Sequence, residues 1–138
     1  EVSRQIAKAA LIPNIVENID SLIEGGDAVL LARDDAENHL RMALPIIESG
    51  LPIYIDKPFA LNVTDAKSKW KAQKYDYQVF TCSALRFAKE LILGEKEWNK
   101  VGDLLWVEAT VPKYWDTYSI HALAPILLQC KTRRKNRQ

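Results

Sequence analysis

Residues 27–61 read DAVLLARDDAENHLRMALPIIESGLPIYIDKPFAL. Residues 27–32 form an unbroken apolar run after the initial acid, which is typical of a parallel strand buried on both faces. Residues 39–49 place apolar side chains at i, i+3, i+4 and i+7, and Gly50 follows where a glycine commonly ends a helix. A second short apolar run occupies residues 52–56. This strand, helix, strand pattern predicts two adjacent parallel strands whose carboxyl ends share one edge of a sheet.

Similar patterns lie on both sides of this unit. We expect helices over residues 1–10, 17–25, 63–74 and 86–98, and strands over residues 78–83 and 104–111. Asn62 or Thr64 is the expected N-cap of the helix over residues 63–74. Alternating strands and helices are the signature of a doubly wound α/β fold. The sequence therefore predicts an α/β protein with a parallel sheet.

The composition limits the classes of partner. The 138 residues are 48% hydrophobic and 27% charged, as in globular proteins, and no apolar run reaches the ~18 residues needed to span a bilayer. The last eight residues, KTRRKNRQ, carry five positive charges and no acid. Such a tail can bind nucleic acid or an anionic membrane, but it is more commonly a solvated end. We therefore expect neither nucleic acid nor a membrane as partner.

The two cysteines argue against a metal centre. Cys82 and Cys130 lie outside any CxxC pattern or Cys/His cluster. Two cysteines also do not make a disulfide framework. We therefore expect no metal site and a reducing, cytoplasmic compartment.

Candidate functional residues follow the first two predicted strands. Ligands of open α/β sheets bind beyond the carboxyl ends of the strands, where this sequence has residues 33–39 and the tripeptide Asp56-Lys57-Pro58. Lysine serves as a general acid or base where burial or a neighbouring charge lowers its pKa. His121 is a second candidate, because histidine suits proton transfer near neutral pH. Lys57 could equally be a surface lysine, and His121 a structural histidine.

Several of these segments resemble the glucose–fructose oxidoreductase / inositol dehydrogenase (Gfo/Idh/MocA) family. That family shows a hydrophobic strand, a loop ending in His, a helix closing on Gly and a strand that runs into Glu-Lys-Pro. Residues 27–61 follow this order. Downstream, residues 82–87 resemble its Arg-Phe segment, residues 100–104 the start of its second domain, and residues 118–122 its histidine motif. The similarity covers nearly all of residues 1–128.

The resemblance implies a fold and its division into domains. Residues 1–84 would form a partial Rossmann-type doubly wound parallel sheet, and residues 85–138 the start of an α+β substrate and oligomerisation domain. The family's first strand and glycine turn would precede Glu1, since the five glycines include no G-x-G-x-x-G. The resemblance thus describes a chain truncated at both ends, and the intact enzyme is expected to be a homo-oligomer.

The implied activity is hydride transfer between NAD or NADP and a hydroxyl-bearing carbon of a sugar, cyclitol or related small-molecule substrate. Lys57 would exchange the hydroxyl proton or hydrogen-bond the oxygen, and His121 would share that role or orient the substrate. The residues implied at the cofactor are Ala32, Asp34, His39, Asp56, Lys57, Pro58 and Arg86. The resemblance also implies a cis peptide bond between Lys57 and Pro58.

The sequence departs from the family pattern near both candidate residues. Asp56 replaces the usual Glu, and Arg33-Asp34 stands where Thr-Pro is common. Thr117 and Ala124 occupy positions around the histidine where many members have acids. The alternative is a catalytically inactive truncated relic, or an interaction module on a dinucleotide-binding fold. We expect the isolated chain to be inactive and to bind dinucleotides poorly, because it lacks the glycine turn.

Overall fold

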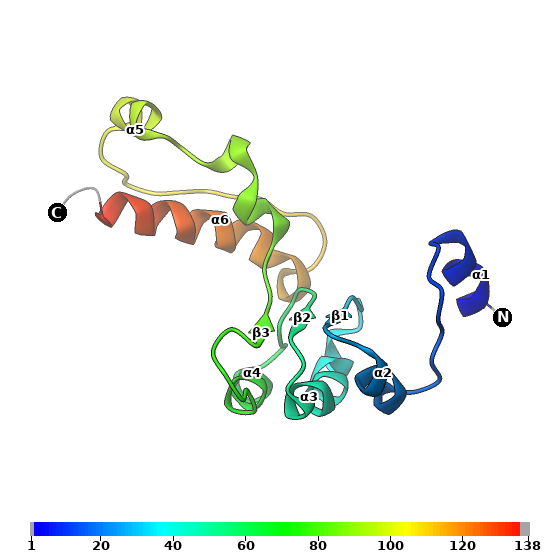
Figure 1. The fold of residues 1–138 in the computed structure, drawn as a ribbon. Coiled ribbons are helices and arrows are strands. Elements are labelled where there is room, and N and C mark those ends of the chain that lie inside the picture. Colours follow the sequence, from blue (N-terminus) through cyan, green and yellow to red (C-terminus); the bar gives the residue numbers. More distant parts are fainter. Residues whose placement is uncertain (1, 136–138) are drawn as a thin grey trace.

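The computed structural model describes residues 2–135, with side chains described for residues 2–130. Its helices are α1 (Val2–Ala9), α2 (Ile19–Gly25), α3 (His39–Ser49), α4 (Val63–Lys71), α5 (Glu95–Val101) and α6 (Trp115–Lys135), its 3-10 turns are η1 (Ala36–Asn38), η2 (Ala84–Phe87) and η3 (Lys89–Leu91), and its strands are β1 (Val29–Leu31), β2 (Ile53–Ile55) and β3 (Val79–Phe80) (Figure 1). The cationic side chains of the C-terminal tail lie outside the described side chains. The described chain is mixed α/β.

The three strands form a parallel sheet in the order β1-β2-β3. Val29 pairs with Ile53, and Ile53 pairs in turn with Val79. Helix α3 connects β1 to β2 and helix α4 connects β2 to β3, which supplies the crossovers that parallel strands require. The predicted parallel pairing of residues 27–32 with residues 52–56 is therefore confirmed.

Local sequence signals set the boundaries of α3 and α4. Gly50 follows α3 with φ 95° and ψ 0°, a left-handed conformation that glycine adopts without a steric penalty. Its N–H donates to the carbonyl of Ile47. Asn62 precedes α4, and its side chain accepts a hydrogen bond of 2.8 Å from the N–H of Asp65. The expected helix end at Gly50 is confirmed, and Asn62 rather than Thr64 is the N-cap.

The core lies between the sheet and helices α2, α3 and α4, which gather beside the strands (Figure 1). Ile19 and Ile23 of α2 pack against it from the edge. The apolar stripe of α3 meets the inward-facing side chains of β1 and β2, as the 3.6-residue period predicts. The buried side chains of this core are Val29, Leu31, Ala43, Ile46, Ile47, Ile53, Ile55 and Val79.

The opposite face of the sheet is largely bare. Leu30, Tyr54 and Phe80 lie in register across the three strands, and the rings of Tyr54 and Phe80 are 5.8 Å apart. Leu30 is 79% exposed and Phe80 is 53% exposed. The expectation that residues 27–32 are buried on both faces is therefore wrong. An apolar run permits burial, but the number of covering layers depends on the rest of the chain.

The chain beyond β3 also differs from its predicted pattern. The helix expected over residues 86–98 is replaced by η2, η3 and the short α5, which begins directly after Gly94. A glycine inside a helix costs about 1 kcal/mol relative to alanine, which favours this interruption. Residues 104–111, expected as a strand, pair with none of the strands in residues 2–135. A single extended segment forms no ladder without a neighbour.

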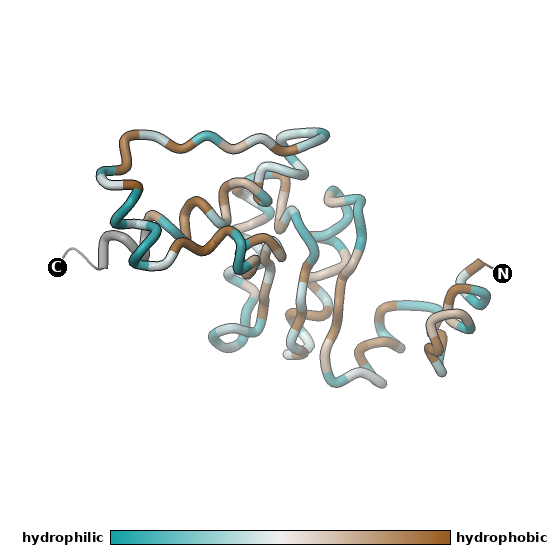
Figure 2. The backbone as a smooth tube through the Cα atoms, turned by 90° about the horizontal axis from the view of Figure 1, so that it is seen from above, coloured by the Kyte–Doolittle hydropathy of each residue, from teal (hydrophilic) through white to brown (hydrophobic). Residues whose placement is uncertain are grey.

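Helix α6 was not assigned from the sequence. It packs against η2, and the extended segment that precedes it runs alongside it (Figure 1). Helix α1 at the N-terminal end and helix α6 at the C-terminal end lie at opposite ends of the molecule, and residues 10–18 join α1 to α2 (Figure 2). None of the helices described is long and apolar enough to cross a membrane.

Truncation of a side chain on each face of the sheet should have unequal effects. Ile55 is fully buried, so Ile55→Ala is expected to lower the free energy of unfolding by about 2–5 kcal/mol. Leu30 is mostly exposed, so Leu30→Ala should change it by no more than about 0.5 kcal/mol. Urea denaturation followed by circular dichroism measures both. A loss for Leu30→Ala equal to that for Ile55→Ala would show that the second face is covered in solution.

Candidate functional site

Lys57 lies at the carboxyl edge of the sheet between two carboxylates. Its Nζ is 3.8 Å from Oδ1 of Asp34 and 3.2 Å from Oδ2 of Asp56. The side chain of Lys57 is 21% exposed, whereas that of Asp34 is fully exposed. The predicted placement of the loop after β1 and of Lys57 at one edge is confirmed. The carboxylates balance the ammonium charge and hold it at this edge.

His39 joins the loops that follow β1 and β2. It is fully buried at the first position of α3. Its Nδ1 lies 3.0 Å from the carbonyl oxygen of Pro58, and its Nε2 lies 2.8 Å from the carbonyl oxygen of Arg33. Both ring nitrogens are therefore occupied within the protein, and the ring fixes the backbone on either side of the site. The Lys57–Pro58 peptide bond is cis, as expected.

Lys69 holds the same loop one residue further on. It is fully buried in α4, and its Nζ donates a hydrogen bond to the carbonyl oxygen of Phe59. The ammonium also lies 4.6 Å from the centre of the Phe59 ring. Burial lowers the pKa of Lys69 below its ordinary value, and the charge of Asp65 opposes this shift. The backbone that carries Lys57 is thus held by two buried basic side chains.

The loop after β1 is organised around Asp35. Arg33 donates two hydrogen bonds of 2.6 Å to its carboxylate, and Asn38 donates a third of 2.7 Å. The hydrogen bond from Arg33 holds the pKa of Asp35 well below its usual range. The side chains of Ala32 and Asp34 in the same loop are exposed at the sheet edge.

Tyr118 of α6 connects Lys57 with His121. The centre of its ring lies 5.8 Å from Lys57 Nζ and 5.4 Å from the centre of the His121 ring. Lys113 Nζ donates a hydrogen bond of 2.7 Å to Tyr118 Oη. This hydrogen bond raises the pKa of Lys113, and the charge of Asp34 contributes in the same direction. The start of α6 therefore closes one side of the sheet edge.

Ser83, which follows β3, forms a hydrogen bond with His121 of α6. Nδ1 of His121 is 2.8 Å from Oγ of Ser83, which is fully buried. The same Oγ accepts a hydrogen bond of 3.2 Å from the N–H of Leu85. Nearby, Tyr54 of β2 donates a hydrogen bond of 3.3 Å to the carbonyl oxygen of Cys82. The contact between Ser83 and His121 places α6 beside the chain that follows β3.

The structure brings most of the predicted residues together. Asp34 and Asp56 lie beside Lys57, and Lys57 and His121 both lie near the Tyr118 ring, whereas Arg86 is exposed on η2. Ala32 is exposed directly after β1, and Pro58 is half-buried beside His39.

Sequence reasoning missed three residues of this site. They are Ser83, Lys113 and Tyr118. The signal for Tyr118 was its spacing of three residues from His121, which places both side chains on one face of a helix. This spacing indicates a shared face only when residues 115–135 are known to be helical. Tyr114 and Trp115, which precede Tyr118, are 78% and 65% exposed.

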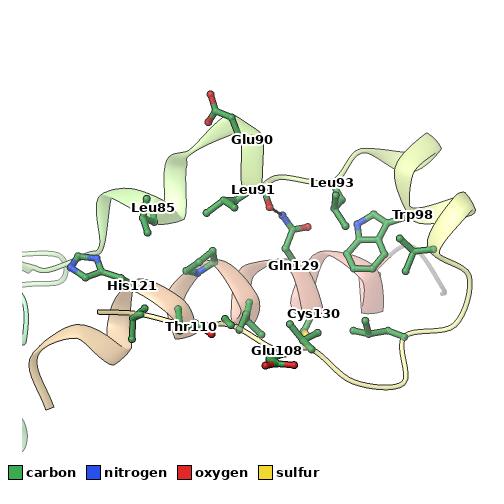
Figure 3. A pocket seen from close by; sticks show the side chains of 18 residues that line it. Leu85, Glu90, Leu91, Leu93, Trp98, Glu108, Thr110, His121, Gln129 and Cys130 are labelled. Carbon is green, nitrogen blue, oxygen red and sulfur yellow. Dashed lines mark hydrogen bonds between the residues drawn. The ribbon is translucent and has the colours of Figure 1, made fainter. Parts of the chain in front are cut away.

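An apolar cavity lies next to this cluster. It has a volume of about 550 Å³, is open on one side and is lined by residues of η2, η3, α5, the extended segment and α6 (Figure 3). His121 lines the end nearest the sheet, and Leu91, Leu93, Trp98 and Ile126 are among the apolar residues that line the rest. Cavities of this size are typical of small-molecule sites.

Neither a metal site nor a similarity to known proteins identifies the function of this site. Within the part of the chain that is described, there is no group of three or more His, Cys, Asp or Glu side chains able to hold a metal ion. Comparisons of the chain with protein-family models, with curated proteins and with solved structures give no match.

The buried ammonium of Lys69 should make stability depend on pH. Its pKa is lowered in the folded chain, so between that lowered value and about 10.5 the unfolded chain binds more protons. The free energy of unfolding should therefore rise with pH across this window. Equivalently, this stabilisation is lost as the pH drops to the folded pKa of Lys69. Urea denaturation at several alkaline pH values, compared with Lys69→Met, measures the effect. An identical pH dependence in both proteins would contradict it.

Proposed function

We propose that this chain forms the nicotinamide end of the active site of an NAD(P)-dependent oxidoreductase of the Gfo/Idh/MocA type, built on a Rossmann-type sheet. The reaction would transfer a hydride between the nicotinamide and a hydroxyl-bearing carbon of a sugar, cyclitol or related substrate. One observation carries the proposal: Lys57 lies at the carboxyl edge of a parallel sheet, beside Asp34, Asp56 and Tyr118. Ligands of open α/β sheets bind at this edge.

The residues at this edge fit the nicotinamide end of a dinucleotide better than its pyrophosphate. Ala32 is small and exposed directly after β1, which leaves space beside Asp34 for a flat ring and its ribose. None of the five glycines lies between a strand and the helix or turn that follows it. The close approach of a pyrophosphate to a helix N-terminus, which such glycines permit, has no counterpart in these loops.

The chain's own side chains would handle the substrate oxygen and its proton. A bound nicotinamide would accept or donate the hydride. Lys57 Nζ would exchange the proton of the substrate hydroxyl, because it is the amine at the sheet edge that is held within reach of a ligand there. Asp34 and Asp56 would keep this amine in place, and His121 would contact the same oxygen from α6.

A non-catalytic interaction module on the same fold is the second candidate. Leu105 and Trp106 are 89% and 72% exposed on the extended segment, and Tyr77 is 95% exposed before β3. Adjacent exposed apolar side chains often mark a surface that binds another protein. On this reading, Lys57 and His121 are the remains of an inactive site.

Chemical-shift mapping by NMR distinguishes these two candidates. Excess nicotinamide mononucleotide should shift the amide resonances of Ala32 and Asp34, because the sheet edge is proposed to bind the nicotinamide end. Adenosine monophosphate at the same concentration should leave them unchanged. NADH should shift the same amides with similarly weak affinity, since these loops hold no glycine turn for its pyrophosphate.

Two lysine variants supply the matched comparison. Lys57→Ala should weaken the shifts at Ala32 and Asp34, whereas Lys67→Ala, on the exposed side of α4, should leave them intact. Equal shifts with both mononucleotides, or shifts confined to residues 104–111, would contradict the proposed cofactor site and favour the interaction module.

A further inference from the structure

The geometry points to Ser83 as a positioning residue that sets the tautomer of His121. In this tautomer the neutral ring carries its proton on Nε2, so His121 is a hydrogen-bond donor to a ligand oxygen rather than an acceptor of its proton. The tautomer follows from contacts within the chain alone. The role of His121 toward a substrate rests on the function proposed above.

Ser83 is built into the junction between the sheet and α6. It follows β3, precedes η2 and is fully buried. Its Oγ has two hydrogen-bond contacts, with the N–H of Leu85 at 3.2 Å and with Nδ1 of His121 at 2.8 Å. The packing of α6 against η2 holds both partners in place.

The direction of the serine–histidine hydrogen bond follows from proton counting. A hydroxyl has one proton to donate. The N–H of Leu85 is itself a donor, so Ser83 Oγ acts as the acceptor there. Among the described contacts of Ser83 Oγ, Nδ1 of His121 is the one acceptor that can take the hydroxyl proton. Nδ1 therefore has no proton of its own, and the proton of the neutral ring is on Nε2.

The opposite arrangement leaves a buried donor without a partner. If Nδ1 carried the proton and donated to Ser83, the hydroxyl proton would face the protein interior with no acceptor among these contacts. An unsatisfied buried donor disfavours such a state on the order of ten-fold or more. The ring of Tyr118, 5.4 Å from the His121 ring, also restricts reorientation of the imidazole.

This tautomer separates the roles of the two candidate catalytic residues. A neutral His121 with its proton on Nε2 can donate to a substrate oxygen but cannot remove the proton of a hydroxyl through that nitrogen. Proton exchange is therefore left to Lys57, and His121 orients the oxygen. The sequence allowed either role for His121, and the contact with Ser83 decides between them.

The tautomer can be read directly from the protein itself. Two-bond ¹H–¹⁵N spectra of the labelled chain, at a pH where the rings are neutral, report which nitrogen of each histidine carries the proton. The wild-type protein is expected to show His121 protonated on Nε2, with the other tautomer below roughly one tenth. Ser83→Ala should raise the Nδ1-protonated fraction at least about two-fold, because the hydroxyl donor is lost.

Two further variants and an internal reference complete the test. Ser83→Thr keeps the hydroxyl and should restore the wild-type pattern. Ser68→Ala on α4 should leave it unchanged, because Ser68 Oγ donates to the Thr64 carbonyl oxygen of its own helix. His39, bound to two backbone carbonyls, should be constant in all four proteins.

A wild-type His121 that is protonated on Nδ1, or that shows an even mixture, would overturn the inference without any variant. An unchanged ring in folded Ser83→Ala would also overturn it. Because no cofactor is present in these spectra, their result is independent of the mononucleotide mapping.

Discussion

The contacts of the two His39 ring nitrogens with the carbonyl oxygens of Arg33 and Pro58 are those on which the candidate site depends. One buried imidazole joins the loop after β1 to the loop after β2, at distances of 2.8 and 3.0 Å. Asp34 and Lys57 each lie one residue from a carbonyl bound in this way. Parallel pairing brings the two loops to the same edge, and His39 fixes their spacing there. Without it, the side-chain contact between the two loops would be the ion pair of Lys57 with the exposed Asp34, and exposed ion pairs contribute little.

The second requirement is that α6 packs at the end of the sheet. Ser83 binds His121, and Tyr118 lies between Lys57 and His121. Side chains of the β2–α4 loop and of α6 therefore share one site, although they are distant in sequence. The apolar cavity beside His121 is lined in part by η2 and α6, which also border the candidate site. A ligand at the sheet edge would therefore have apolar space next to it.

Much of the sheet could be predicted because its signals are local. Gly50 and Asn62 set helix boundaries through their own backbone and side-chain chemistry, and α3 displays its period within eleven residues. Parallel pairing then followed from general rules of connection, and it placed Lys57 at the correct edge. Burial could not be predicted in the same way. Leu30 belongs to an apolar run yet is 79% exposed. Whether such a side chain is buried depends on the elements that pack over that face of the sheet, and the run itself does not specify them.

The partners of His121 could not be predicted for a related reason. Ser83 and Tyr118 become neighbours of His121 only when α6 forms and packs against η2. Helix α6 contains Pro125, and proline is unfavourable in helix interiors, so the sequence pattern does not predict this helix. The extended segment of residues 104–111 shows the converse, since its alternating pattern favours a strand but the described chain offers it no partner.

The meeting of the β2–α4 loop with α6 is the central claim, and nuclear Overhauser effects between Lys57 and Tyr118 test it most directly. Because the Lys57 ammonium lies 5.8 Å from the centre of the Tyr118 ring, the methylene protons next to it should show cross-peaks to the ring protons. The resonances of these Lys57 methylene protons should also be shifted upfield relative to those of the exposed Lys67. Absence of these cross-peaks, with Lys57 and Lys67 methylene shifts the same, would show that α6 does not reach the sheet edge and would contradict the account.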